Sequence, residues 1–202
     1  MLQNLRPQTS GQLREYQYKS FLDTYNLSVE NIPFYYGDST SDIGFLQFLH
    51  EKTLSLTQES PQLVHQIVHN ENLDGDSYLK NRAVEYIFNF AKENNIDIKK
   101  LLRVKLNLLL KNKTDKKFFH NPHIDRAGEQ HKVLIFYQND SDGDTIVFNE
   151  KFSEKKGTIL SIDKRIRPEK GKVIDFDGDI WHTSSNPCSI NYRLVMNVNY
   201  VI

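Results

Sequence analysis

The second half of the chain consists of short runs in which apolar and polar residues alternate. From about residue 101 these runs are LLRVKLNLLL, KVLIFYQ, TIVFNE, GTILSI, KVIDF and RLVMNVNYVI. A period of two is typical of half-buried β-strands, because successive side chains point to opposite faces of a sheet. Gly, Asp, Asn, Pro or charged clusters separate the runs, and this close spacing predicts an antiparallel sandwich or barrel.

The first half has a different pattern. Its first 40 or so residues are polar and rich in turn signals, so we expect only short elements and loops there. Ser41 and Asp42 can cap a helix that carries Ile43, Leu46 and Leu49. A longer helix is predicted over about 76–94 by an apolar stripe at helical spacing: Leu79, Ala83, Val84, Ile87, Phe88 and Ala91.

Helices that precede a run of strands predict an α+β fold with the N-terminal helices packed on one sheet. A chain of 202 residues fits one domain. We therefore expect a single domain over 1–202, in which 1–100 is a mostly helical and loop support region and 101–202 is the β core.

Charge and cysteine content exclude several classes. The 26 Lys and Arg residues balance 26 Asp and Glu residues, so no global field favours nucleic acid, which is not an expected partner. Cys188 is the only cysteine, which excludes a disulfide framework and a multi-cysteine zinc site. No apolar run approaches the length of a membrane span. We expect no membrane association, a cytoplasmic location and a monomer or weak dimer.

The residues that carry chemistry lie in the β half. His123 and Asp125 in FFHNPHIDRAGE are two apart, and on a strand such residues project to the same side. His182, in KVIDFDGDIWHTSSNP, supplies a third ligand. Two imidazoles and one carboxylate form the facial triad that leaves three positions open on Fe(II), as an oxygenase requires. Zinc is more often closed by four protein ligands or activates one water.

Arg193 begins the alternating run RLVMNVNYVI, so it shares one face with Asn197 and Asn199. A buried arginine on this polar stripe needs a partner. A dicarboxylate fits that requirement, because the guanidinium fork binds a carboxylate through two hydrogen bonds.

The order H-x-D, aromatic strand, G-x-T-x-x-F strand, W-H and then Arg resembles the 2-oxoglutarate/Fe(II)-dependent dioxygenase superfamily. The likeness covers about 101–202 and is specifically to its prolyl 4-hydroxylase-like branch, including small oxygenases of tailed phages of marine bacteria. It implies a double-stranded β-helix core, of the jelly-roll or cupin-like kind. It also implies that His123, Asp125 and His182 bind iron and that Arg193 binds the C5 carboxylate of 2-oxoglutarate.

The resemblance implies two further pocket residues and an activity. Tyr137 would give the same carboxylate a second hydrogen bond, and Asn107 would line the pocket. The family often has a tyrosine shortly after this asparagine position, where this chain has Leu109 and Leu110. The implied cofactors are Fe(II), 2-oxoglutarate as co-substrate and O2, with ascorbate as a candidate reductant. The implied reaction hydroxylates a C–H bond and releases succinate and CO2.

The substrate is less determined, because it depends on loops and on the N-terminal half. A peptidyl proline comes first by family analogy, so a peptide or protein partner is expected in the cytoplasm of a bacterial or phage-infected cell. Alternatives are a free amino acid or another small metabolite, then a nucleobase. A rival from another class is a non-catalytic, cupin-like metal-binding protein. His120 and His131 flank the motif without a role that the sequence decides, and Trp181 is expected to pack over the metal end of the core.

Overall fold

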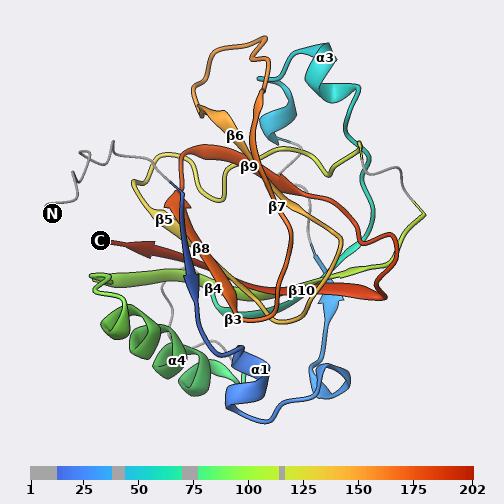
Figure 1. Cartoon of the computed structure of the whole chain (residues 1–202). Coiled ribbons are helices and arrows are strands. Elements are labelled where there is room, and N and C mark those ends of the chain that lie inside the picture. Colours follow the sequence, from blue (N-terminus) through green and yellow to red (C-terminus); the bar gives the residue numbers. More distant parts are fainter. Residues whose placement is uncertain (1–12, 38–43, 70–76, 114–116) are drawn as a thin grey trace, which may run out of the picture.

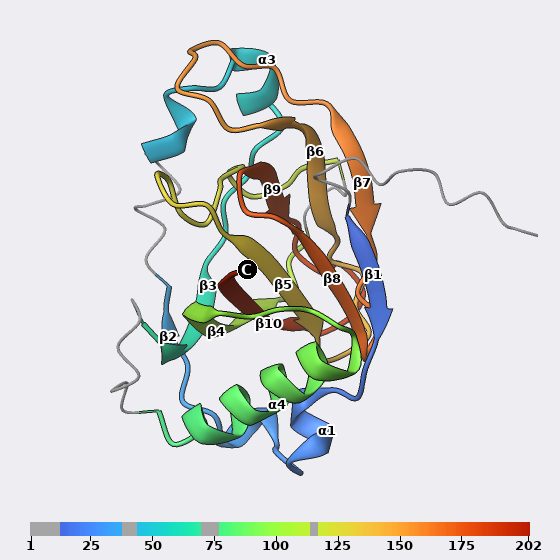
Figure 2. The same cartoon turned by 90° about the vertical axis from the view of Figure 1, so that its left-hand side faces the viewer.

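The computed structural model describes residues 13–37, 44–69, 77–113 and 117–202. Within these residues two antiparallel sheets face each other, and a helix covers the outer face of the larger one (Figures 1 and 2). The larger sheet has the order β1 (Arg14–Gln17), β8 (Lys172–Asp177), β5 (Lys132–Tyr137), β10 (Tyr192–Val201), β4 (Lys100–Leu110), β3 (Gln62–Val68) and β2 (Tyr35–Tyr36). The smaller sheet has the order β7 (Ile162–Ile166), β6 (Thr145–Lys151) and β9 (Ile180–Ser184). This arrangement confirms the predicted α+β fold with a jelly-roll core.

The space between the sheets is filled by one face of each strand. On β5, Val133, Ile135 and Tyr137 point between the sheets, while Leu134 and Phe136 point to the outer face. β5 is therefore buried on both sides, as expected where a helix covers the sheet, and this is why residues 133–137 are apolar without alternation. β10 lies between β4 and β5 and pairs with both along most of its length, so it is the centre of the larger sheet.

Helix α4 (Lys80–Glu93) packs on the outer face of this sheet. The predicted helix is confirmed from Lys80 onward, and its predicted start at residue 76 lies outside the described residues. Ala83, Ile87 and Ala91 are buried as expected, but Phe88 is 41% exposed. The buried face instead includes Tyr86 and Phe90. The predicted apolar stripe was therefore wrong at Phe88, which is apolar but faces solvent.

The N-terminal half contributes strands as well as helices. β1 and β2 form the two edges of the larger sheet, and β3 pairs with β4. The other helices are short: α1 (Phe21–Thr24), a 3-10 helix (Val29–Asn31) and α3 (Glu51–Leu54). The helix cap predicted at Ser41 and Asp42 lies outside the described residues. None of the described helices has the length and apolar character needed to cross a membrane.

One predicted strand is shifted. The run GTILSI was expected to be a strand over 157–162, but β7 begins at Ile162. Gly157 has a φ of 78°, in the left-handed region that interrupts a strand, and Thr158 makes only an isolated bridge to Leu49. Leu160 packs instead on a small aromatic cluster beside the smaller sheet. This segment is therefore a connection between β6 and β7.

Candidate metal centre

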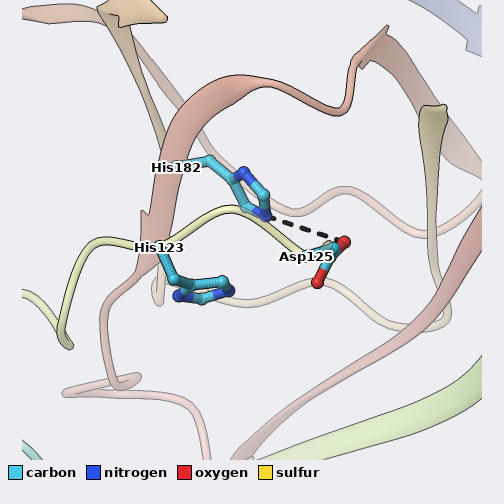
Figure 3. A group of neighbouring side chains, drawn as sticks. All are labelled: His123, Asp125 and His182. Carbon is cyan, nitrogen blue, oxygen red and sulfur yellow. Dashed lines mark ion pairs between the residues drawn. The ribbon is translucent and has the colours of Figure 1, made fainter. Parts of the chain in front are cut away.

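Two of the three predicted ligands are brought together by a single bridge between backbone segments. The amide of His123 donates to the carbonyl of His182 at 3.0 Å, and the amide of His182 donates back to the carbonyl of His123 at 3.0 Å. Residues that exchange both hydrogen bonds lie directly opposite each other. The two imidazole rings are 4.8 Å apart between centroids and point the same way (Figure 3).

Asp125 completes the group. Its carboxylate points toward the two rings, with Oδ2 3.8 Å from Nε2 of His182 (Figure 3). One nitrogen of each histidine and one carboxylate oxygen all lie within 4.8 Å of one another. All three predicted ligands therefore converge on one point, although His182 comes from β9 and the other two precede β5.

The backbone determines which nitrogen each ring presents. Nδ1 of His123 lies 3.0 Å from the carbonyl of Asn121, and Nδ1 of His182 lies 2.9 Å from the carbonyl of Ile180. A carbonyl oxygen can only accept, so each Nδ1 carries the hydrogen and each Nε2 carries the lone pair. Metal-ligating histidines usually donate their other ring nitrogen in this way. Both rings therefore have the tautomer and orientation that a metal ion requires.

Asp125 is ionised in this environment. Burial alone would raise the pKa of its carboxyl, but Arg103, the two histidines and Lys105 hold that pKa well below its usual range. Arg103 lies 2.5 Å from Oδ1, and the amides of Asn197 and Asn199 donate to Oδ2. The carboxylate is thus anionic at neutral pH, as a metal ligand must be.

The donor set fits iron better than a structural zinc site. Two imidazole nitrogens and one carboxylate oxygen are the non-haem Fe(II) facial triad. In the described part of the chain no fourth His, Cys, Asp or Glu belongs to this group, whereas a structural zinc ion is usually closed by four ligands. The three residues can hold Fe(II) and leave coordination positions for other molecules.

Arg193 lies in the same cavity as the triad. The cavity has a volume of about 680 Å³, and its wall includes His123, Asp125, His182 and Arg193. Arg193 is only 3% exposed, and its Nη2 donates to Oγ1 of Thr145 at 2.6 Å. Burial lowers the pKa of Arg193, although Tyr137 and the carboxylate of Asp144 act against this shift. Among the described residues Arg193 forms no salt bridge, and its Nε has no hydrogen-bond partner. The site thus contains a buried cation without a salt bridge to any described residue.

Comparison with solved structures identifies the fold, although no family model and no curated protein sequence matches the chain. An oxidoreductase of the 2OG-Fe(II) oxygenase family from Burkholderia pseudomallei is 15% identical, with a TM-score of 0.51 over 85% of this chain and 74% of that one. The non-haem, α-ketoglutarate-dependent epimerase SnoN from nogalamycin biosynthesis is 9% identical, with a TM-score of 0.56 over 93% and 77%. A prolyl-4-hydroxylase from Pseudomonas putida is 8% identical, with a TM-score of 0.50 over 94% and 92%. The chain has the fold of the 2-oxoglutarate/Fe(II) oxygenases.

Within this oxygenase fold, Tyr137 does not lie on the cavity wall. It is fully buried, and its hydroxyl donates to Oγ1 of Thr145 at 2.7 Å. Burial raises the pKa of Tyr137 to about 12. Thr145 therefore lies between Tyr137, Arg193 and the cavity and accepts from both. In the sequence, Thr145 was noted only as the threonine of the G-x-T-x-x-F motif, without a role of its own.

The other predicted pocket residue lies on the wall. Asn107 on β4 lines the cavity, is 7% exposed, and has an Oδ1 without a hydrogen-bond partner in the described structure. Asn197 and Asn199 share the face of β10 with Arg193 as predicted. Their amides bind Asp125 rather than Arg193, however, so the polar stripe serves the metal ligand.

Three residues that the sequence left open now have positions. His120 lines the cavity, with Nδ1 3.5 Å from a carboxylate oxygen of Glu59. His131 lies outside the cavity, with its ring against Gly178. Trp181 is fully buried and packs edge-on against Phe45, so it belongs to the core rather than to the cavity wall. Of the three, His120 can contact a bound molecule.

Proposed function

We propose that the chain is an Fe(II)- and 2-oxoglutarate-dependent dioxygenase. The observation that carries the proposal is that one cavity contains both a facial triad and a buried arginine that forms no salt bridge with a described residue. A five-carbon dicarboxylate with a 2-oxo group can chelate the metal at one end and bind Arg193 at the other. The shared fold with several 2-oxoglutarate oxygenases supports the same proposal.

His123, Asp125 and His182 would hold the iron, which supplies the activation of O2 that couples decarboxylation of 2-oxoglutarate to hydroxylation of a C–H bond. The products are succinate, CO2 and a hydroxylated substrate. The chain's own residues bind and orient the reactants and exclude water from them.

Arg193 would bind the C5 carboxylate of 2-oxoglutarate. Its guanidinium is held over the ring of Tyr137, with a distance of 5.9 Å from Cζ to the ring centroid, and by its bond to Thr145. Since Thr145 already accepts hydrogen bonds from Arg193 and Tyr137, its own hydroxyl hydrogen can be donated to a carboxylate in the cavity. Tyr137 would then act through Thr145, and Asn107 would line the same pocket.

For the primary substrate, a peptidyl proline is the proposal, and its support is the fold shared with a prolyl-4-hydroxylase. Tyr35 and Tyr36 at the cavity wall are 69% and 80% exposed, which suits a mouth that receives part of a larger molecule. Fe(II), 2-oxoglutarate and O2 are the proposed cofactors, and ascorbate would keep the iron reduced between turnovers.

The test is succinate formation by the purified protein with Fe(II) and 2-oxoglutarate, in air and under argon. We expect succinate only in air, and none when Zn(II), which has no redox chemistry, replaces Fe(II). A panel of proline peptides and free amino acids would then be searched for a product heavier by one oxygen atom. No succinate with any substrate, despite bound Fe(II), would favour a non-catalytic metal-binding protein.

A further inference from the structure

The carboxylate of Asp125 is surrounded by hydrogen-bond donors from two neighbouring strands. Arg103 of β4 donates to Oδ1 at 2.5 Å, and Asn199 of β10, which pairs with Arg103 across the sheet, donates to Oδ2 at 2.7 Å. Asn197 donates to the same Oδ2 at 3.2 Å. The side chain of Asp125 is 2% exposed, so water does not take the place of these donors.

The orientation of both amides is determined by their partner. An ionised carboxylate can only accept hydrogen bonds, so Asn197 and Asn199 must each turn their nitrogen toward Asp125. A carboxylate has about four lone-pair directions, two on each oxygen. Two donors occupy Oδ2 and one occupies Oδ1, so about one direction remains, and it lies on Oδ1.

A carboxylate that coordinates a metal ion in a bidentate way uses one lone pair from each of its two oxygens. We infer that Asn197 and Asn199, which occupy both lone pairs of Oδ2, are positioning residues that make Asp125 a monodentate ligand of the metal. This inference rests on the proposed function, and within that function it assigns a role to the two asparagines that donate to Asp125. A monodentate carboxylate leaves three coordination positions open on a six-coordinate ion, enough for chelating 2-oxoglutarate and O2. A bidentate carboxylate would leave only two coordination positions open.

This inference can be tested by binding, without turnover. The full-length protein loaded with Mn(II) would be titrated calorimetrically with 2-oxoglutarate and with glutarate. Glutarate has the same length and the same distal carboxylate for Arg193, but it lacks the 2-oxo group and cannot chelate in the same way. The ratio of the two dissociation constants therefore measures whether two adjacent metal positions are open.

Asn199→Leu removes a donor from Oδ2 and frees a lone pair there. We expect Mn(II) to bind as tightly as before or more tightly, while the preference for 2-oxoglutarate over glutarate falls by about tenfold or more. Asn197→Leu removes the other donor from Oδ2 and should shift the ratio in the same direction. Circular dichroism and thermal unfolding would establish that each variant is folded.

The control is Gln66→Met. Gln66 also presents an amide to the cavity wall, but that amide donates to the backbone of β3 and β4 and not to Asp125. Its 2-oxoglutarate to glutarate ratio should equal that of the wild type.

An unchanged ratio in folded Asn199→Leu and Asn197→Leu, including the case in which both ligands lose affinity equally, would overturn the inference alone. Loss of Mn(II) binding in both folded variants would also overturn it, because the donors would then serve affinity. A wild-type protein that binds Mn(II) but does not prefer 2-oxoglutarate would overturn the proposed function as well.

Discussion

Replacing Arg193 by leucine removes the buried guanidinium that is expected to recognise the distal carboxylate of 2-oxoglutarate by charge. In the free protein the guanidinium is 3% exposed, with one bond to Thr145 and no bond from Nε. A carboxylate bound to this fork would gain two charge-assisted hydrogen bonds in a site that excludes water. Removing one member of such a buried pair typically costs about 2–5 kcal/mol. We therefore expect Arg193→Leu to weaken 2-oxoglutarate by about 30-fold to several thousand-fold.

The assay is calorimetric titration of the Mn(II)-loaded protein with 2-oxoglutarate, with oxaloacetate and 2-oxoadipate as shorter and longer acids. The variant should be at least as stable as the wild type, because it replaces a buried cation without a salt bridge to a described residue by an apolar side chain. Its melting temperature should no longer rise with 2-oxoglutarate, since ligand stabilisation depends on affinity. Arg193→Lys should be intermediate, because an ammonium cannot form the two-pronged contact.

The matched control is Arg82→Leu, which removes an arginine of α4 whose Cζ lies 5.8 Å from the ring centroid of Tyr25 and which does not line the cavity. Its affinity for 2-oxoglutarate should be unchanged. If Arg193→Leu also bound 2-oxoglutarate as tightly as the wild type, the assignment of Arg193 would be wrong and the oxygenase proposal would lose its main support.

The remaining predictions concern the triad and the hydroxyl pair. His182→Ala should abolish succinate formation, and residual activity above a few per cent of wild type would show that the ligand is misassigned. Tyr137→Phe should lower the affinity for 2-oxoglutarate several-fold in titrations, because Thr145 loses a donor that orients it. An unchanged affinity would show that Tyr137 only packs in the core. Asp125→Asn should destabilise the metal-free protein by about 3–5 kcal/mol in urea, since Arg103 loses its anion. The pKa of Asp125 is lowered by folding, so its contribution is present above about pH 4 and lost as the pH falls through the folded-state value. Stability should therefore decline less on acidification in Asp125→Asn than in wild type.

The β core was predictable because its strands are buried on both faces or alternate strictly. β4, β5, β6, β8 and β10 begin and end within a residue or two of the predicted runs. β9 was not predicted as a strand, because IWHTS carries polar residues that face the cavity. β1 and β2 are short edge strands that are stabilised by pairing with residues far away in the sequence. No local sequence pattern indicates such pairing.

The candidate site was predictable in its ligands but less so in their surroundings. His123, Asp125 and His182 were placed by order and residue type, and the structure brings all three together. Arg103 and Thr145 received no role from the sequence, because their contacts join residues 22 and 48 positions apart. Asn197 and Asn199 were found as a polar stripe on the face of Arg193, but their hydrogen bonds to Asp125 were not predicted. Periodicity tells which face of β10 a side chain occupies and not which neighbour lies opposite.

The bridge between His123 and His182 bears on how the protein acquires metal. Two ligands that are far apart in sequence are joined by backbone hydrogen bonds, and each ring is oriented by its own local carbonyl. None of these contacts needs an ion, so the apo protein should already hold the coordination geometry, unlike domains in which metal binding is the folding reaction. Chelators should therefore strip the ion without unfolding the chain. Re-addition should restore the site at a rate set by ion entry into the cavity rather than by refolding.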